Sequence, residues 1–318
     1  MGDVNACIEG QLPSAFPALP LTHFRYFSTI PTMGIISEKQ TIRLATWNMG
    51  FWEHKKAHEE AWHWLFDELR PDIALCQECI PPDWARQTRT VIWDRAYPER
   101  ERQPWGTALV THLPAKLTRF PELDAWIDQL PKRDANNELA FVHRADGWLS
   151  TAEVDLPLIG KTHIISVHSP AYEIPADWLK GIDISAIRLK LNKNIWLLDV
   201  LFYFLRNRLG SQLIVGGDFN YSRLLDDPRK PSGNNEFFDR IDQEGFVSLH
   251  RKFHSADEQT FFKEGKREHQ LDYLYADSSV ARHAVSCKVV PNADLKEMSD
   301  HAPLVAEFGF ESGPDMPR

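Results

Sequence analysis

The stretch Leu213-Ile-Val-Gly-Gly-Asp-Phe-Asn220 places a carboxylate and a carboxamide at the end of an apolar run. The run from Leu213 to Val215 predicts a buried strand, and residues two apart on extended backbone share a face, so Asp218 and Asn220 point the same way. The two glycines allow a ligand or another backbone to come close. An anionic oxygen beside a neutral amide suits a divalent metal with a water or phosphate next to it. The simpler interpretation is a strand that ends in an Asx turn.

The same arrangement recurs along the chain, because several apolar segments end in a residue that can bind a metal or a phosphate. These residues are Asn48, Glu78, His168, Asp218 with Asn220, Asp272, and Asp300 with His301. Carboxylates hold a hard cation through oxygen. Amides and histidines bind a phosphate oxygen or transfer a proton. Each residue alone is ordinary, but their joint recurrence at strand ends is what a site between two sheets requires.

Alternating and β-branched segments predict the strands that must position these residues. The expected strands are 41–48, 72–78, 105–111, 149–156, 161–168, 213–215, 270–275, 288–291 and 304–308, with 260–262 forming a hairpin with 270–275. Apolar residues at helical spacing predict helices over 53–69, 83–90, 177–209 and 236–244. Residues 121–147 are long, charged and loop-like, which predicts a substrate-facing insertion.

The composition is that of a globular protein with a sizeable core, with 43% hydrophobic and 25% charged residues among 318. One domain is expected over residues 41–310. Residues 1–40 show no periodicity and no signal-peptide pattern, which predicts a disordered leader, and residues 311–318 a frayed tail. The net charge of -9 disfavours a strong overall attraction to nucleic acid or anionic membranes. No apolar run is long enough to span a membrane, and four cysteines without a disulfide framework predict a cytoplasmic location.

Two other metal-like motifs have simpler interpretations. Cys76-x-x-Cys79 has no second pair at zinc-site spacing, and Cys76 lies in an apolar run, which predicts a core residue. His54 and His58 are four residues apart on the predicted helix. Glu59 is not placed as in a zinc-protease helix, so a solvated helix face is expected there.

Six short blocks together resemble the signature blocks of the endonuclease/exonuclease/phosphatase superfamily. They are Thr46-Trp-Asn48, Gln77-Glu78, Val167-His168-Ser169, Gly217-Asp-Phe-Asn220, Leu271-Asp-Tyr273 and Ser299-Asp-His301, in the order that the family has them. The resemblance implies an α+β fold, a four-layer α/β/β/α sandwich of two mixed, mostly antiparallel sheets flanked by helices. It also implies a phosphoester hydrolase that depends on Mg²⁺ or Mn²⁺.

The resemblance implies a role for each metal-binding and water-positioning residue. Glu78 corresponds to the principal metal ligand, with Asn48 beside it, and Asp300 to a second metal-site carboxylate. Asp218 and Asn220 correspond to the pair that positions the attacking water or the phosphate.

The two histidines have implied roles as well. His301 corresponds to the residue that contacts the phosphate or acts as a base, with Asp272 as its orienting partner. His168 corresponds to the histidine that stabilises the phosphorane or protonates the leaving group. A carboxylate hydrogen-bonded to an imidazole fixes its tautomer and raises its basicity.

The substrate is indicated less directly. Val167-His-Ser-Pro170 resembles a block of the secreted deoxyribonucleases, and Gly217-Asp-Phe-Asn-Tyr221 resembles the inositol-phosphate phosphatases. A Trp-Cys-Asp-Arg block of those phosphatases is replaced here by Glu268-His-Gln-Leu271. A DNA or RNA endonuclease or exonuclease is therefore expected. The alternatives are a phosphomonoesterase, such as a phospholipid or inositol-phosphate phosphatase, and a catalytically inactive nucleic-acid-binding module.

A nucleic acid or another phosphoester is thus the expected binding partner, and several residues near the site can contact it. Arg223 offers a cation, while Trp105 and Tyr172 can stack on bases. Further candidates on the same loops are Trp52, Arg229, Lys230, Lys263, Lys266 and Arg267.

Overall fold

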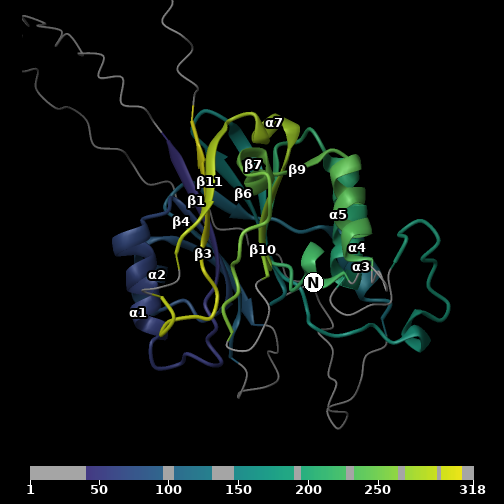
Figure 1. The fold of residues 1–318 in the computed structure, drawn as a ribbon, viewed down its shortest axis with the longest axis horizontal. Helices are drawn as coiled ribbons and strands as arrows, with labels where there is room; N and C mark the ends of the chain where they lie inside the picture. Colours follow the sequence, from purple (N-terminus) through teal and green to yellow (C-terminus); the bar gives the residue numbers. More distant parts are fainter. Residues whose placement is uncertain are drawn as a thin grey trace, which may run out of the picture. The chain divides into compact units, whose positions relative to one another are not determined.

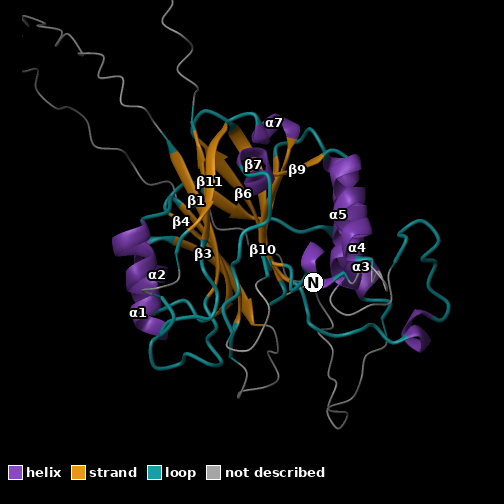
Figure 2. Ribbon diagram, viewed as in Figure 1, coloured by secondary structure: helices purple, strands orange, loops and turns teal. Residues whose placement is uncertain are grey.

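Two six-stranded sheets form the centre of the molecule (Figures 1 and 2). The computed structural model describes residues 41–95, 104–130, 147–189, 195–226, 233–263, 269–291 and 295–309. The first sheet has the order β11 (Ala284–Val289), β12 (Leu304–Phe308), β1 (Ile42–Asn48), β2 (Ile73–Cys79), β4 (Gly106–Thr111), β3 (Thr90–Arg95). The second has the order β5 (Ala115–Leu117), β6 (Leu149–Leu156), β7 (Gly160–His168), β8 (Leu213–Asp218), β10 (Asp272–Asp277), β9 (Phe246–Ser248).

Each sheet contains one parallel pair among antiparallel neighbours. β1 runs parallel to β2, which places Asn48 beside Gln77, and β7 runs parallel to β8, which places His168 beside Asp218. The predicted pair of mixed, mostly antiparallel sheets is confirmed. Because parallel strands end at the same edge of a sheet, each parallel pair brings two chain segments with polar ends together.

Helices cover the outer face of each sheet (Figure 2). α1 (His58–His63), which continues into a π-helical turn η1 (Trp64–Leu69), and α2 (Asp83–Thr88) lie on the first sheet. α3 (Pro121–Ile127), α4 (Ile195–Leu205) and α5 (Asn234–Gln243) lie on the second. The shorter helices are η2 (Ala176–Leu179), η3 (Arg206–Arg208), η4 (Arg223–Leu225), α6 (Leu249–Phe253) and α7 (Ser278–Ala281). This is the predicted four-layer sandwich.

Strand alternation divides the core into a layer between the sheets and one layer under each set of helices. In β1, Leu44 belongs to the apolar cluster between the sheets, whereas Ala45 and Trp47 pack with Trp62 of α1. On the second sheet, Phe202 of α4 belongs to the outer cluster. Since inward-facing positions alternate along each strand, the last inward residue of a strand emerges at the edge of this layer, between the two sheets.

Several predicted boundaries are wrong. Within the described residues, the helix expected over 177–209 is divided into α4 and the short helices η2 and η3, because Gly181 adopts a positive φ of 87° and the Asp183 side chain accepts hydrogen bonds from Ser185, which stabilises a turn. The helix expected from residue 53 begins at His58, because residues 51–57 form turns. Residues 121–127 form α3 rather than a loop, since Leu123, Trp126 and Ile127 are buried. The strands β3, β5 and β9 are not predicted from sequence.

The alternative metal motifs also have structural explanations. His58 is buried rather than solvated, because its Nε2 accepts hydrogen bonds from Ile80 N at 3.0 Å and Trp62 Nε1 at 3.1 Å. Cys76 and Cys79 are free, buried thiols, as expected for core residues. In the described part of the chain no helix has the length and apolar character needed to cross a bilayer. The predicted leader over 1–40 and residues 310–318 lie outside the described residues.

Gly217 permits the close approach of β7 to β8 that places His168 beside Asp218. A Cβ at this position would lie 1.8 Å from the carbonyl oxygen of Val167, and Gly217 has φ of 151°. We expect Gly217→Ala to lower the free energy of unfolding by about 3 kcal/mol, at the upper end of the cost of overpacking. Urea denaturation measures this difference.

Gly309→Ala is the matched control, because a Cβ there would make an ordinary 3.4 Å contact with Thr41. We expect this variant to stay within about 0.5 kcal/mol of the wild type. Equal urea midpoints for Gly217→Ala, Gly309→Ala and the wild type would contradict the β7–β8 register.

Candidate active site

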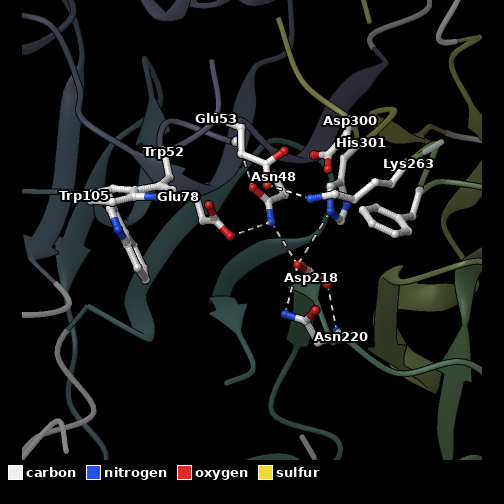
Figure 3. A pocket seen from close by; sticks show the side chains of 12 residues that line it. Asn48, Trp52, Glu53, Glu78, Trp105, Asp218, Asn220, Lys263, Asp300 and His301 are labelled. Atoms are coloured by element: carbon white, nitrogen blue, oxygen red, sulfur yellow. Dashed lines mark hydrogen bonds and ion pairs between the residues drawn. The ribbon is translucent and has the colours of Figure 1, made fainter. Parts of the chain in front are cut away.

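Three neighbouring strands of the second sheet place His168, Asp218 and Asp272 in a row. Asp218 is paired with His168 in the parallel β7–β8 ladder and with Asp272 in the antiparallel β8–β10 ladder. All three side chains are buried. Asn48 at the end of β1 and His301 before β12 meet Asp218 from the first sheet (Figure 3). The strand-end residues therefore converge between the two sheets.

Asp218 is the hydrogen-bonding centre of this group. Its Oδ2 accepts from Asn48 Nδ2 at 2.9 Å, and its Oδ1 accepts from the backbone N–H of Asn220 at 2.7 Å. Asn220 adopts a left-handed φ of 53°, and its Nδ2 donates to the carbonyl oxygen of Ser169 at 2.9 Å. The strand thus ends in an Asx turn, and the same turn leaves Asn220 in the lining of the site. The Asx turn is therefore observed, and the metal- or phosphate-binding interpretation of this stretch stays a prediction.

A backbone irregularity brings Glu78 into the site. Alternation assigns Gln77 to the face between the sheets, where its Nε2 donates to Ser166 Oγ at 3.0 Å, and would send Glu78 outward. The β2–β4 pairing is interrupted between Cys76 and Cys79, and Glu78 has a left-handed φ of 45°. Its Oε1 consequently lies 3.4 Å from Asn48 Nδ2 and 3.5 Å from His168 Nε2. Bulges that redirect a side chain are common beside active sites.

His301 is fixed by hydrogen bonds to its ring and its backbone. Its Nδ1 lies 2.8 Å from Asp272 Oδ2, and its backbone N–H donates to Ser299 Oγ at 3.0 Å. Ser299 Oγ also donates to the carbonyl oxygen of Asn48 at 2.6 Å, and Trp47 Nε1 donates to the carbonyl oxygen of His301. Ser299 therefore holds the segment before β12 against β1. It is a positioning residue that the sequence analysis missed, although it stands inside a block singled out there.

Burial and neighbouring charges separate the pKa values of the buried groups. Burial raises the pKa of Asp218 to about 7 against the opposing effect of His301. Burial alone would lower the pKa of His301, but the carboxylates of Asp272 and Asp218 raise it to about 10. Burial and the charge of His301 lower the pKa of His168 to about 3. At neutral pH His301 is an imidazolium and His168 a neutral imidazole.

These residues open into a cleft of about 370 Å³. It is lined by Asn48, Gly50, Trp52, Glu53, Glu78, Trp105, Asp218, Asn220, Phe261, Lys263, Asp300 and His301 (Figure 3). Lys263 Nζ pairs with Glu53 Oε1 at 2.6 Å, and Trp52 is 48% exposed. Glu53 is a second residue missed from sequence, because it was assigned to a helix instead of a turn.

The structure separates the three predicted substrate-binding residues. Trp105 lines the cleft, with its ring centroid 5.5 Å from that of His168. The Arg223 guanidinium pairs with Asp239 and Asp242 of α5 and does not line the cleft. Tyr172 packs against Trp148 and Trp196, behind the cleft wall. The candidate cations Arg229, Lys230, Lys266 and Arg267 lie outside the described residues.

The donor set of the cleft fits a divalent cation. Glu78 has a raised pKa because of burial, and the carboxylates of Asp300 and Glu53 raise it further. The carboxylate Oδ1 of Asp272 is buried without a hydrogen-bond partner among the described residues. A hard cation bound through oxygen would reduce the repulsion between these carboxylates and would give Asp272 Oδ1 a partner.

Two separate sets of residues can hold such an ion. One set is Glu78, Asn48 and Asp300, which line the cleft together. The other is Asp218, Asp272 and His301, whose ligand atoms lie within 4.8 Å of one another.

Comparisons with known proteins agree with this architecture. Solved structures with a similar fold include a variant of the 3′ phosphatase NExo from Neisseria bound to product DNA hairpin (17% identity, 85% of this chain and 100% of that chain, TM-score 0.59). A second is an AP endonuclease from Archaeoglobus fulgidus (19% identity, 84% of this chain and 99% of that chain, TM-score 0.56). A third is the AP endonuclease LMAP from Leishmania major (15% identity, 85% of this chain and 88% of that chain, TM-score 0.57). At these identities the likeness concerns the fold. No curated protein matches the sequence.

A family model gives a sequence-based assignment. The model described as the endonuclease/exonuclease/phosphatase family matches residues 45–301. That range contains all the strand-end residues that meet in the cleft. The chain therefore belongs to the endonuclease/exonuclease/phosphatase family.

Proposed function

We propose that this protein is a divalent-metal-dependent phosphodiesterase that cleaves nucleic acid, with DNA as the first candidate substrate. The family relationship supports hydrolysis of phosphoester bonds in general. The observation that carries the proposal is the buried carboxylate of Asp218, whose pKa is raised to about 7, beside the Asp272–His301 pair at the base of the cleft. A base and a cation so placed can activate a water and bind a phosphate in the same space.

The chain's own residues divide this work. The His301 imidazolium, held by Asp272, binds a phosphate oxygen and stabilises the charge that develops on it. Asp218 accepts the proton of the attacking water, because its raised pKa lies near the operating pH and the amide N–H groups of Asn48 and Asn220 fix its orientation. Bound by Glu78 with Asn48 and Asp300, Mg²⁺ or Mn²⁺ would neutralise phosphate charge as a Lewis acid.

Neutral His168 completes the set on the other side of Asp218. Its Nε2 lies 3.5 Å from Glu78 Oε1 and 3.8 Å from Asp218 Oδ2. The rings of Trp105 and Trp148 contact it and limit the access of water. In this position a neutral imidazole donates a hydrogen bond to the phosphate without adding a second positive charge beside His301.

Two features support a nucleic acid over a small phosphoester. Trp52 and Trp105 line the cleft, and aromatic rings beside a phosphate site stack on bases or sugars. The similar structures are two AP endonucleases and a 3′ phosphatase bound to product DNA hairpin. By this likeness, an abasic site or a 3′ end in duplex DNA is the substrate to test first.

The direct test is Mg²⁺-dependent cleavage of labelled single-stranded DNA, duplex DNA, an abasic duplex, a 3′-phosphorylated duplex and RNA. We expect EDTA-sensitive cleavage of DNA that falls at least about 100-fold in His301→Ala, because a charged phosphate contact is lost. Release of phosphate from inositol phosphates alone would overturn the nucleic-acid assignment and leave the catalytic one. Binding of DNA without turnover of any substrate would indicate an inactive binding module.

Glu78→Gln separates the metal-binding role from a structural one. We expect turnover at fixed Mg²⁺ to fall by about 100-fold or more, as for the loss of a principal electrostatic contact. The melting temperature of the metal-free protein should stay the same or rise, because the raised pKa of Glu78 means that its buried negative charge opposes folding above that pKa. Thermal unfolding with and without Mg²⁺, alongside kinetics, measures both effects.

Glu122→Gln is the matched control, since Glu122 lies on α3 and pairs with Arg208 at the surface. It should change neither turnover nor the response to Mg²⁺. Unchanged turnover in Glu78→Gln would show that Glu78 is not a ligand of the catalytic metal.

Asp272→Asn tests the protonation states. Activity of the wild type should rise with pH as Asp218 loses its proton around pH 7 and fall as His301 loses its proton around pH 10. The Asp272 charge raises both pKa values, so the amide should move both limbs of the kcat/KM profile to lower pH. The control is Asp67→Asn, which alters a surface contact of 3.3 Å between Asp67 Oδ2 and His63 Nδ1. This variant should leave the pH profile of kcat/KM unchanged. An alkaline limb that does not move would mean that His301 does not supply the cation.

A further inference from the structure

A second group of metal-ligating side chains lies outside the cleft. His250 is in α6, His254 is the residue that ends α6, and Glu258 follows in the next loop. One ligand atom from each lies within 4.8 Å of the others. None of the three lines the catalytic cleft, and the proposed phosphodiesterase does not use them.

The separation between two of these ligand atoms matches a tetrahedral metal site. His250 Nε2 lies 3.3 Å from Glu258 Oε2, which is long for a hydrogen bond between charged groups. Two ligands at the 2.0–2.1 Å distances typical of zinc are separated by about 3.4 Å along a tetrahedral edge. The ring of His254 lies nearly parallel to that of His250, with centroids 4.3 Å apart and an interplanar angle of 13°. One of its ring nitrogen atoms lies within 4.8 Å of the ligand atoms of His250 and Glu258.

A hydrogen bond from the ring of His254 fixes its tautomer in a form that can bind a metal. Its Nε2 lies 2.7 Å from the carbonyl oxygen of Cys287 in β11. A carbonyl oxygen only accepts, so Nε2 carries the proton and Nδ1 holds a free lone pair. Histidines that bind metals in proteins commonly donate their other ring N–H to a carbonyl or carboxylate in this way.

His250 also has unused binding capacity. Its side chain is 1% exposed, and its Nδ1 has no hydrogen-bond partner among the described residues. Burial lowers its pKa, which keeps the imidazole neutral, as a metal ligand requires. His250 Nε2 and Glu258 Oε2 are in hydrogen-bond contact at 3.3 Å, and a cation bound between them, with the ring proton on Nδ1, would replace this contact with two metal–ligand bonds.

We propose that His250, His254 and Glu258 bind a Zn²⁺ ion, with a water as the fourth ligand. Two imidazoles and one carboxylate suit zinc, whereas Mg²⁺ and Ca²⁺ prefer ligand sets made only of oxygen. Glu258 is half exposed, which gives the ion and its water access from solvent.

This ion would act on the support of the active site rather than on the reaction. It would tie the loop after α6 to the helix, and through His254 to β11. The backbone N–H of Glu258 donates to Gln270 Oε1, and Thr260 Oγ1, two residues on, accepts from the backbone N–H of Asp272. The bound ion would therefore stiffen the segment that holds the strand carrying Asp272.

The test is zinc titration of the untagged, metal-free protein in millimolar Mg²⁺, which keeps the oxygen-rich cleft occupied, with a competing chelator setting free Zn²⁺. We expect one equivalent of Zn²⁺ to bind and to raise the melting temperature. Glu258→Gln and His254→Gln should each weaken binding more than tenfold, since even indirect partners of a metal ligand contribute 10- to 100-fold. The visible spectrum of the Co²⁺ form should show tetrahedral coordination.

Glu258→Gln is the decisive variant, because His254→Gln also removes the hydrogen bond to the Cys287 carbonyl. The matched control is His63→Gln, which alters a surface His–carboxylate contact of the same 3.3 Å length that has no third ligand among the described residues. Equal zinc affinity in Glu258→Gln and the wild type would overturn the proposal. Loss of the bound zinc in Glu78→Gln instead would assign the ion to the cleft.

Discussion

The carboxylate of Asp218, buried between two sheets, is the constraint on which the rest of the structure depends. Removing an ionised carboxylate from water is costly unless donors replace the lost hydration. The donors come from separate parts of the chain: Asn48 at the end of β1, Asn220 in the turn after β8, and the charge of His301 from the segment before β12. The contacts of Asp218 in the folded structure therefore depend on segments from both sheets.

Local backbone exceptions concentrate where these segments meet. Gly217 lets β8 approach the Val167 carbonyl, Asn220 takes a left-handed conformation, and Glu78 does the same within a bulge. A non-glycine residue in this region costs on the order of 1 kcal/mol or more. Packing of the surrounding core offsets this cost. As a result, the side chains of Glu78 and Asn220 depart from the regular alternation of the strands and point into the cleft.

Sequence reasoning succeeded mainly where the pattern is local. Apolar runs that end in Asn48 and Asp218 identify their strands and polar ends without any tertiary information, whereas Asp272 begins β10 and His301 precedes β12. The pairing of Arg223 with α5 depends on partners further along the chain, so the position of that guanidinium could not be read from spacing. The turn at Gly181 is local, but the apolar spacing of residues 177–209 does not reveal it, so the true length of α4 was missed. Regular alternation even predicts the wrong side for Glu78, because a single bulge reverses it. Its place at the end of an apolar run and the family blocks both singled it out, although alternation did not.

The electrostatics of the cleft oppose the stability of the metal-free protein. The raised pKa values of Asp218 and Glu78 mean that burial disfavours their charged forms, which are the forms that the proposed mechanism uses. His301 offsets part of this through a charge of its own, which Asp272 maintains by direct contact. Apolar residues in place of Asp218 and Glu78 would remove this unfavourable burial of charge, but they would also remove the groups that the proposed mechanism needs. The carboxylates of Glu78, Asp300 and Asp218 in the cleft favour a divalent cation there, as the proposed function requires.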